Sequence, residues 1–253
     1  MSRPGVSLAV GALVTAVLAA AAAFGPLPYV VEQPGPAVDV LGSYDGETVI
    51  AVTGADVSAS AGKLLLTTVR VQTEVTLGDA VRGWFDDDRA VVPRSVVYPD
   101  GQTGEETDAR NAELFRGSQT SAVAVALRTL KNQPAEQPGI SFGVDEIGGP
   151  SAGLMFTLGI IDKLTPQDLT GGRIIAGTGA VGDTGAVNPI GGIPQKLRGA
   201  EAAGAQLFLV PEGNCTEALR NVRPGLTMAR VATVEEALTA VATFTGGGVP
   251  EPC

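Results

Sequence analysis

A turn rich in glycine and proline, Gly-Gly-Pro-Ser-Ala-Gly at residues 148–153, interrupts an apolar segment and leads directly into the apolar run 154–161. The glycines and the proline favour a tight turn, and the first N–H groups of the following helix have no acceptor within that helix. Ser151 is therefore a candidate nucleophile, beside donors that suit an oxyanion. Two simpler interpretations remain open: Ser151 caps the helix, or the turn binds an anion.

The composition restricts which base could activate Ser151. The 253-residue chain has no histidine, which excludes Ser-His-Asp and Cys-His catalysis and argues against a zinc site or any other metal site. The acidic run 86–88 lacks the spacing of a calcium loop and is read as a solvated turn. A serine without a histidine partner needs a lysine or a carboxylate as its base. The chain has only four lysines: Lys63, Lys131, Lys163 and Lys196.

The positions of these four lysines in the sequence decide which of them could act as the base for Ser151. Lys163 lies twelve residues after Ser151 on the same expected helix, about 18 Å away, and Lys131 lies in a polar connection. Lys63 precedes a buried strand, where a hydrated ammonium is expected. Lys196 follows Gly-Gly-Ile-Pro-Gln and belongs to the first turn of a helix, where the helix dipole and apolar neighbours would lower its pKa. The alternative for Lys196 is an ordinary solvated lysine.

The N-terminal segment predicts a location outside the cytoplasm. Residues 6–24 are apolar or small, Arg3 precedes them, and the first acidic residue afterwards is Glu32. A segment of this length can span a bilayer, and the charge bias places the N-terminus in the cytoplasm and the body outside. A cleaved signal peptide is the competing interpretation. Both interpretations place the body outside the cytoplasm, where an oxidising environment favours a disulfide between Cys215 and Cys253, although two cysteines do not prove a pairing.

The chain as a whole has the composition of a globular protein, with a formal net charge of -10 and its 17 basic residues dispersed. That balance argues against a nucleic-acid partner. Gly62-Lys63 is followed by Leu64, and residue 57 is valine, so no phosphate-binding loop is present and no cofactor is expected. The activity should then be independent of ATP.

Local patterns predict a β-rich first part and an α/β second part. Strands are expected at 48–53 and 64–71, a short helix capped by Thr76, and a helix over 110–130. After residue 140, helices alternate with strands at 173–176, 186–187, 207–211 and 226–231. Residues 233–236 read as a capping box before a last helix at 237–244.

Three segments together resemble one family. Residues 147–156 around Ser151, the run 176–179 with Thr178, and residues 188–196 ending at Lys196 are similar to the proteolytic domain of the Lon family, including the spacing of its Ser-Lys dyad. The resemblance implies the following roles: Ser151 is the nucleophile, Lys196 the general base and Thr178 a hydrogen-bond partner of the lysine. It also implies an oxyanion hole of backbone N–H groups around Gly149 to Ser151, with Gly149 and Pro150 as supporting residues.

The N-terminal segment and the serine motif are most similar to membrane-anchored bacterial Lon-like proteases that carry a PDZ domain. Such relatives insert this peptide-docking module where only nine residues join Leu130 to Ile140 here, which leaves substrate capture open. Cytosolic Lon proteases have an acidic residue three positions before the serine. This chain has Gly148 there, with Asp145 and Glu146 slightly earlier. Family members form rings, commonly hexamers, so the resemblance implies a homo-oligomer.

The sequence therefore predicts an α/β (α+β) Lon-type fold preceded by one transmembrane helix. Its expected parts are an anchor or signal (1–27), a Lon-like protease domain (28–245) and a tail (246–253). Within the domain, 28–131 is the β-rich part and 140–245 the catalytic part. The expected function is an ATP-independent, extracytoplasmic serine endopeptidase for unfolded or flexible polypeptides. The alternative is a catalytically idle scaffold of the same fold.

Overall fold

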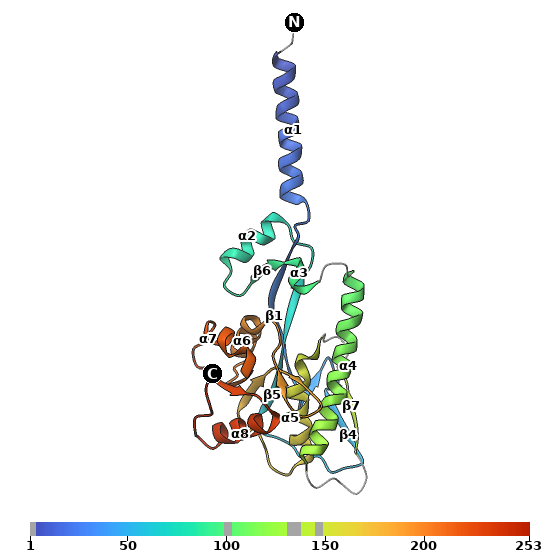
Figure 1. Ribbon diagram of the computed structural model, residues 1–253, viewed down its shortest axis with the longest axis vertical. Coiled ribbons are helices and arrows are strands. Elements are labelled where there is room, and N and C mark those ends of the chain that lie inside the picture. Colours follow the sequence, from blue (N-terminus) through green and yellow to red (C-terminus); the bar gives the residue numbers. More distant parts are fainter. Residues whose placement is uncertain (1–3, 99–102, 131–137, 145–148) are drawn as a thin grey trace. The chain divides into compact units, whose positions relative to one another are not determined.

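The computed structural model describes residues 4–98, 103–130, 138–144 and 149–253 (Figure 1). Its contacts divide the chain into two compact units, and each is discontinuous in sequence. Unit 1 comprises Met1–Gln33 and Arg70–Gln102, and unit 2 comprises Pro34–Val69 and Thr103–Cys253. Strands β1 (Tyr29–Asp39) and β5 (Lys63–Gln72) each begin in one unit and end in the other.

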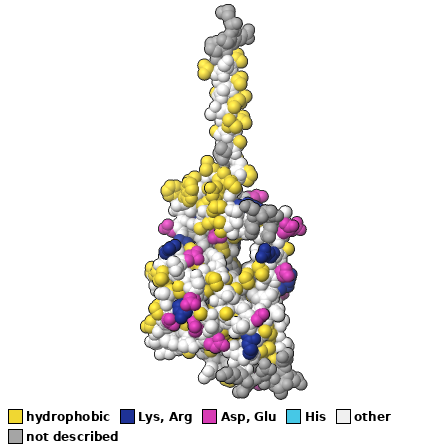
Figure 2. All heavy atoms as spheres, in the orientation of Figure 1, with side chains coloured by type: hydrophobic (Ala, Val, Ile, Leu, Met, Phe, Trp, Pro, Cys, Tyr) yellow, Lys and Arg dark blue, Asp and Glu magenta, His cyan; other side chains and the backbone are white. Residues whose placement is uncertain are grey.

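Unit 1 begins with helix α1 (Pro4–Phe24), whose hydrophobic side chains are exposed along its length (Figure 2). Among the helices within the described residues, none combines the length and apolar character needed to cross a membrane. The transmembrane helix predicted from the sequence is therefore not found in the structure.

The rest of unit 1 is a small strand and helix assembly. It contains α2 (Leu77–Phe85), β6 (Ala90–Pro93) and α3 (Arg94–Val97), and β6 pairs antiparallel with the start of β1. The predicted cap of α2 is confirmed: Thr76 accepts from Asp79 N–H, and the Asp79 carboxylate accepts from Thr76 N–H. This capping box satisfies donors that would otherwise lack partners at the start of a short helix.

Unit 2 holds the larger hydrophobic core. Its helices are α4 (Gly104–Thr129), η1 (Pro150–Ala152), α5 (Gly153–Leu164), α6 (Ile193–Ala202), η2 (Glu212–Asn214), α7 (Cys215–Leu219) and α8 (Val234–Thr245). Its strands, besides parts of β1 and β5, are β2 (Ser43–Tyr44), β3 (Glu47–Thr48), β4 (Ile50–Thr53), β7 (Gly139–Phe142), β8 (Ile174–Gly177), β9 (Ala180–Val181), β10 (Val187–Asn188), β11 (Leu207–Pro211) and β12 (Thr227–Val231).

The main sheet has the strand order β12-β11-β8-β5-β1-β6. The four strands from β12 to β5 pair in parallel. Side chains alternate between the two faces of each strand, so Leu64 and Leu66 of β5 pack in one core cluster and Leu65 in another. The first cluster includes α4, α5 and α8, and the second includes α6 and α7, so helices cover both faces. The expected mixed α/β class is confirmed.

Helix α5 is the central element of this core. Its first ten residues are all buried, as expected for a helix that is apolar on every side. The Phe156 ring packs edge-on against Phe115 of α4 and at a tilt against Phe142 of β7, at ring-centroid distances of 5.8 and 4.8 Å. Gly159 allows close approach, because a Cβ there would lie 2.8 Å from side-chain atoms of Val40 and Ile50. Tight packing on all sides fixes the position of the turn that precedes α5.

Several predicted element boundaries agree with the structure, and others differ. Strand β11 occupies the expected residues, whereas α4 begins at Gly104, six residues earlier than predicted, because Thr103 and Glu106 form a capping box. The predicted capping box before α8 is half formed. Thr233 accepts from Glu236 N–H, but the Glu236 carboxylate accepts from Ala232 N–H, one residue before the cap.

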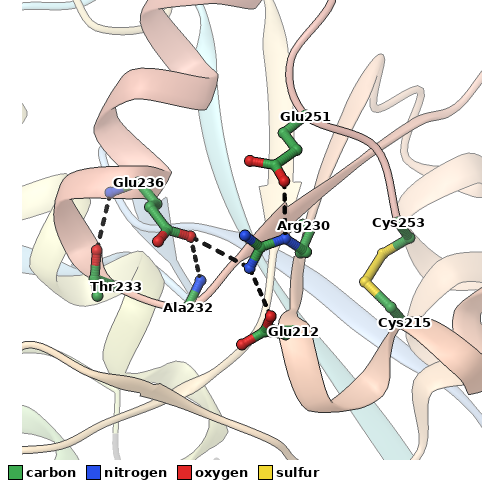
Figure 3. Close-up of polar contacts among 8 residues, drawn as sticks. All are labelled: Glu212, Cys215, Arg230, Ala232, Thr233, Glu236, Glu251 and Cys253. Atoms are coloured by element: carbon green, nitrogen blue, oxygen red, sulfur yellow. Dashed lines mark hydrogen bonds and ion pairs between the residues drawn. A yellow bond between two sulfur atoms is a disulfide. The ribbon is translucent and has the colours of Figure 1, made fainter.

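The C-terminal tail is fixed to the edge of the main sheet. Cys215 and Cys253 form a disulfide (Figure 3). Pro252 forms a β-bridge with Ala229 of the edge strand β12. Arg230 contacts the carboxylates of three glutamates, Glu212, Glu236 and Glu251, and the last of these lies in the tail. Covering an edge strand in this way satisfies backbone groups that could otherwise pair with another chain.

Candidate active site

The serine lies in a short 3-10 turn, η1, immediately before α5. Gly149 precedes this turn with φ +83° and ψ 166°, a conformation that essentially only glycine adopts. Its N–H donates to the carbonyl oxygen of Asn111 on α4, at 3.0 Å. Pro150 then begins the turn with the restricted φ that suits a helix start. Ser151 is thus presented at the N-terminal end of the buried helix.

The loop after β8 ties down the main chain of the serine. Gly179 N–H donates to the Ser151 carbonyl at 2.9 Å, and Thr178 Oγ1 donates to the same oxygen at 3.2 Å. Leu154 N–H in turn donates to the Gly179 carbonyl at 3.0 Å. These bonds fix the peptide that carries the serine side chain to the end of a sheet strand.

Lys196 is delivered by the first turn of α6. Gly192 caps this helix in the left-handed region, at φ +75°, and a Cβ there would lie 2.6 Å from a Val69 methyl group. The preceding loop is held by Asn214, whose side chain accepts from Ile190 N–H and donates to the Ile190 carbonyl. The glycine turn and the asparagine clamp together set the direction in which the lysine enters the core.

The side chains of Ser151, Lys196 and Thr178 form one hydrogen-bonded group. Lys196 Nζ lies 2.7 Å from Ser151 Oγ and 3.0 Å from Thr178 Oγ1. Because the Thr178 hydroxyl donates its proton to the Ser151 carbonyl, its oxygen is left to accept from Lys196. A neutral lysine would then direct its lone pair at the serine hydroxyl. The residues that the sequence singled out separately are therefore in contact.

Burial controls the charge of this lysine. Lys196 is only 3% exposed, and Thr178 is completely buried. Desolvation lowers the Lys196 pKa from 10.5 to about 7, because the buried ammonium loses its hydration. No charged group within the described residues contributes to this shift. A lysine with such a pKa is unprotonated in a substantial fraction of molecules at neutral pH, as a general base requires.

The expected oxyanion donors are not all available in this conformation. The N–H of Gly149 is bonded to Asn111, and Pro150 has no N–H. The N–H of Ser151 itself is the donor of this predicted set that remains. Sequence analysis identified neither Asn111 nor Asn214. Asn111 acts through its backbone carbonyl, and Asn214 acts across a distance in sequence that no local pattern indicates.

Some residues that were considered from the sequence lie outside the described residues, and Lys163 lies away from Ser151. Gly148, Asp145, Glu146 and Lys131 all lie outside the part of the chain that the structure describes. Lys163 of α5 donates to the Leu41 carbonyl instead of reaching Ser151. Within the described ranges, no group of three or more Cys, Asp or Glu side chains is arranged to hold a metal ion.

Comparison with known proteins gives a match over the part of the chain that contains this site. Residues 143–243 match the family model of the Lon protease (S16) C-terminal proteolytic domain. The resemblance to the Lon proteolytic domain is therefore confirmed for this segment, which includes Ser151, Thr178 and Lys196. The match supports a hydrolase of the serine peptidase class.

Individual relatives agree with the domain match. The chain is 32% identical to Lon protease 2 of Bacillus subtilis over 133 residues, which cover 51% of this chain and 23% of the relative. It is 29% identical to Lon protease 2 of Herpetosiphon aurantiacus over 167 residues, or 61% of this chain and 20% of the relative. The Lon protease of Desulfatibacillum aliphaticivorans is 38% identical over 93 residues, or 36% and 11%. The chain thus matches a quarter or less of the length of these relatives.

Proposed function

We propose that this protein is a serine endopeptidase that uses Ser151 as nucleophile and Lys196 as general base. The observation that carries the proposal is the 2.7 Å separation of Ser151 Oγ and Lys196 Nζ within a largely buried site. A nucleophile and a base within hydrogen-bond reach, with the base oriented by a third group, form the arrangement required for covalent catalysis. Thr178 is that third group.

In the acylation step, Ser151 Oγ attacks the carbonyl carbon of the substrate peptide bond, and its proton passes to Lys196 Nζ. The Ser151 N–H would donate to the oxyanion that forms. The Lys196 ammonium then gives its proton to the leaving amine as the C–N bond breaks. The products of this step are an acyl-enzyme ester on Ser151 and a released amine.

Deacylation uses the same groups in the same order. Lys196, again neutral, accepts a proton from water as the water oxygen attacks the ester carbonyl. The lysine then returns this proton to Ser151 Oγ as the ester bond breaks, which releases the carboxylic acid. Because no charged partner near Lys196 in the described part of the chain holds the proton, it is transferred readily in both directions.

Hydrolysis by the purified full-length chain tests the proposal. Casein or an unstructured fluorogenic peptide should be cleaved without ATP, and Ser151→Ala and Lys196→Ala should each remove the activity. Thr68→Val, at a half-buried position on the other face of β5, is the matched control and should retain it. Hydrolysis that survives both dyad substitutions would contradict the proposal.

A serine-reactive fluorophosphonate distinguishes the endopeptidase from the idle scaffold predicted as the alternative. The proposed enzyme should be labelled at Ser151, and Lys196→Ala should slow the labelling. A folded wild-type chain that neither reacts with the probe nor cleaves peptides would favour the scaffold.

We further propose that the body of the protein functions outside the cytoplasm on unfolded or flexible polypeptides, as a homo-oligomer. The Cys215–Cys253 disulfide supports an oxidising compartment, because such bonds persist there and are rare in the cytosol. Thiol trapping in intact cells should find both cysteines oxidised. Finding them as free thiols would argue against this location, and sedimentation analysis would test the oligomer.

A further inference from the structure

Thr67 of β5 is a buried hydroxyl whose role the proposed dyad does not explain. Its side chain is 3% exposed, and its Oγ1 has no hydrogen-bond partner within the described residues. A buried polar atom without a partner lowers stability, so such an atom calls for an explanation. The Thr178 hydroxyl, which is also buried, is by contrast hydrogen-bonded.

The alternation of side chains along β5 places Thr67 on the face covered by α6. Leu65, two residues earlier, packs in the cluster that contains Ile193 and Leu197 of α6. Val69, two residues later, contacts the position of Gly192 at the start of α6. Because side chains at i, i+2 and i+4 share one face of a strand, Thr67 also faces this helix.

The strand register then places Thr67 next to the dyad. Strands β5 and β8 are parallel, and their last paired residues are Leu66 and Gly177, which directly precede Thr67 and Thr178 in the chain. We therefore infer that Thr67 and Thr178 lie near each other. Thr178 shares the α6 face with Ala176, which packs in the same cluster as Leu65. Neighbouring side chains on adjacent strands lie about 5 Å apart. Thr178 Oγ1 is itself 3.0 Å from Lys196 Nζ.

The lysine needs an additional acceptor when it carries the proton. An ammonium has three N–H donors, and Ser151 and Thr178 provide two acceptors. A third donor left unpaired in a buried site would disfavour the protonated intermediate. Gln195, on the same helix, has a buried Nε2 without a partner in the described residues. This atom is a hydrogen-bond donor and cannot accept a hydrogen bond from the ammonium.

We propose that Thr67 Oγ1 accepts the third N–H of Lys196 while the lysine holds the serine proton, either after rotation of the threonine side chain or through one water molecule. This inference rests on the proposed peptidase function and assigns Thr67 as a positioning residue for the base. Thr67 thereby stabilises the charged form of Lys196 and leaves the neutral form free to accept a proton. No charged side chain from β5, β8 or α6 contributes to the Lys196 pKa within the described residues, so the hydroxyls are the groups that can do so.

Four full-length proteins make the test: wild type, Thr67→Val, Thr67→Ser and Thr68→Val. Thr67→Val keeps the shape of the side chain but removes the hydroxyl, and Thr67→Ser retains it. Thr68→Val makes the same chemical change on the opposite face of β5, where Thr68 Oγ1 donates to the Pro36 carbonyl. If Thr67→Val does not fold, Thr67→Ala replaces it, because it also lacks the hydroxyl and adds no atom.

The first readout is the Lys196 pKa itself, measured by NMR with isotope-labelled lysine. The chain has only four lysines, and Lys196→Met identifies the signal. We expect Thr67→Val to lower the Lys196 pKa by about one unit, because the charged form loses a hydrogen bond. Thr67→Ser and Thr68→Val should titrate as the wild type does.

The second readout is the pH profile of kcat/KM for peptide hydrolysis. In Thr67→Val the acidic limb should move to lower pH, and the maximum rate should fall on the order of tenfold. Thr67→Ser should restore both the position and the height of the profile. A general loss of packing would lower the rate without moving the limb.

The two readouts separate failure of this inference from failure of the proposed function. An unchanged or raised Lys196 pKa in Thr67→Val would overturn the role of Thr67, whatever the activity. A lowered pKa in a chain whose wild type neither cleaves peptides nor reacts at Ser151 would support the contact and contradict the peptidase. A shift of equal size in Thr68→Val would also overturn the inference, because the effect would not be specific to the α6 face.

Discussion

A lysine lies at each end of helix α5, at least partly shielded from water, and the groups that surround the two lysines differ. At the N-terminal end, Lys196 of α6 reaches Ser151, and its environment contains hydroxyl groups and apolar side chains. At the C-terminal end, Lys163 is partly buried and donates to the Leu41 carbonyl. Burial lowers the pKa of both lysines. The difference lies in the charges around them.

Lys163 has carboxylates nearby, and Lys196 has none within the described residues. Asp162 and Asp39 act against the effect of burial on Lys163, because an opposite charge favours the ammonium. Asp162 is 1% exposed and bonded to Ser60 Oγ at 2.5 Å and to Leu169 N–H at 2.8 Å. At the C-terminal end of α5, the Asp162 carboxylate thus connects loop residues to the helix. Because no such countercharge lies near Lys196 among the described residues, this lysine is suitable as a base.

The largest expected difference between the two ends is in catalysis. Lys196→Met should lower kcat/KM about 10²–10⁴-fold, the usual contribution of a general base. Lys163→Met should leave hydrolysis unchanged, because that side chain lies at the far end of α5. Steady-state kinetics with a fluorogenic peptide compares the two variants. Equal losses in both would show that the two lysines are not functionally different.

The pH dependence of activity should follow the neutral form of Lys196. With a pKa of about 7, kcat/KM should fall about tenfold per pH unit below pH 7, because the protonated lysine cannot accept the serine proton. Lys163→Met should have the same profile. Rates measured from pH 5 to 9 test this expectation, and a flat profile would contradict it.

The two substitutions should also differ in their effect on the free energy of unfolding. The folded-state pKa of Lys196 is below its value in the unfolded chain, so the unfolded state binds more protons between about pH 7 and 10.5, and stability rises with pH in that window. Lys196→Met should therefore stabilise the protein most at pH 6, by at most about 5 kcal/mol, and less at pH 9. Lys163→Met should stabilise it less, because Asp162 and Asp39 offset part of the desolvation of Lys163.

Urea unfolding of both variants and the wild type at pH 6 and 9 measures these changes. A Lys196→Met chain that is less stable than the wild type at pH 6 would mean that the hydrogen bonds of the lysine outweigh its desolvation. A stabilisation that grows with pH would contradict the assigned direction of the pKa shift.

The smallest expected effect concerns Asp162. Burial raises its pKa above 3.8, so the folded state binds its proton more readily, and wild-type stability gains as the pH falls from neutral. Asp162→Asn lacks this titration. Its stability relative to the wild type should therefore decline as the pH falls from 7 to 4.5. Denaturant midpoints at the two pH values check this, and a constant difference would exclude Asp162 as the titrating group.

The fold was partly predictable because much of it follows from local patterns. The alternation of helices and strands after residue 140 predicted the α/β class, and β11 occupies the residues expected. The start of α4 was missed because the capping box at Thr103 precedes the apolar residues that define the period. The membrane span expected from the apolar residues 6–24 was not found among the described helices. The apolar composition of residues 6–24 alone did not decide whether this segment is a membrane span.

Within the candidate site, the sequence by itself determined which residue types were available. The lack of histidine and the glycine turns before Ser151 and Lys196 reduced the choice to one pair. Only the tertiary structure decided the rest, because its causes are contacts between segments far apart in the chain. Packing around α6 removes Lys196 from water, and the pairing of β5 with β8 ends at Leu66 and Gly177, the residues just before Thr67 and Thr178. The bond of Gly149 N–H to Asn111 and the fixing of the C-terminal tail likewise depend on the folded core.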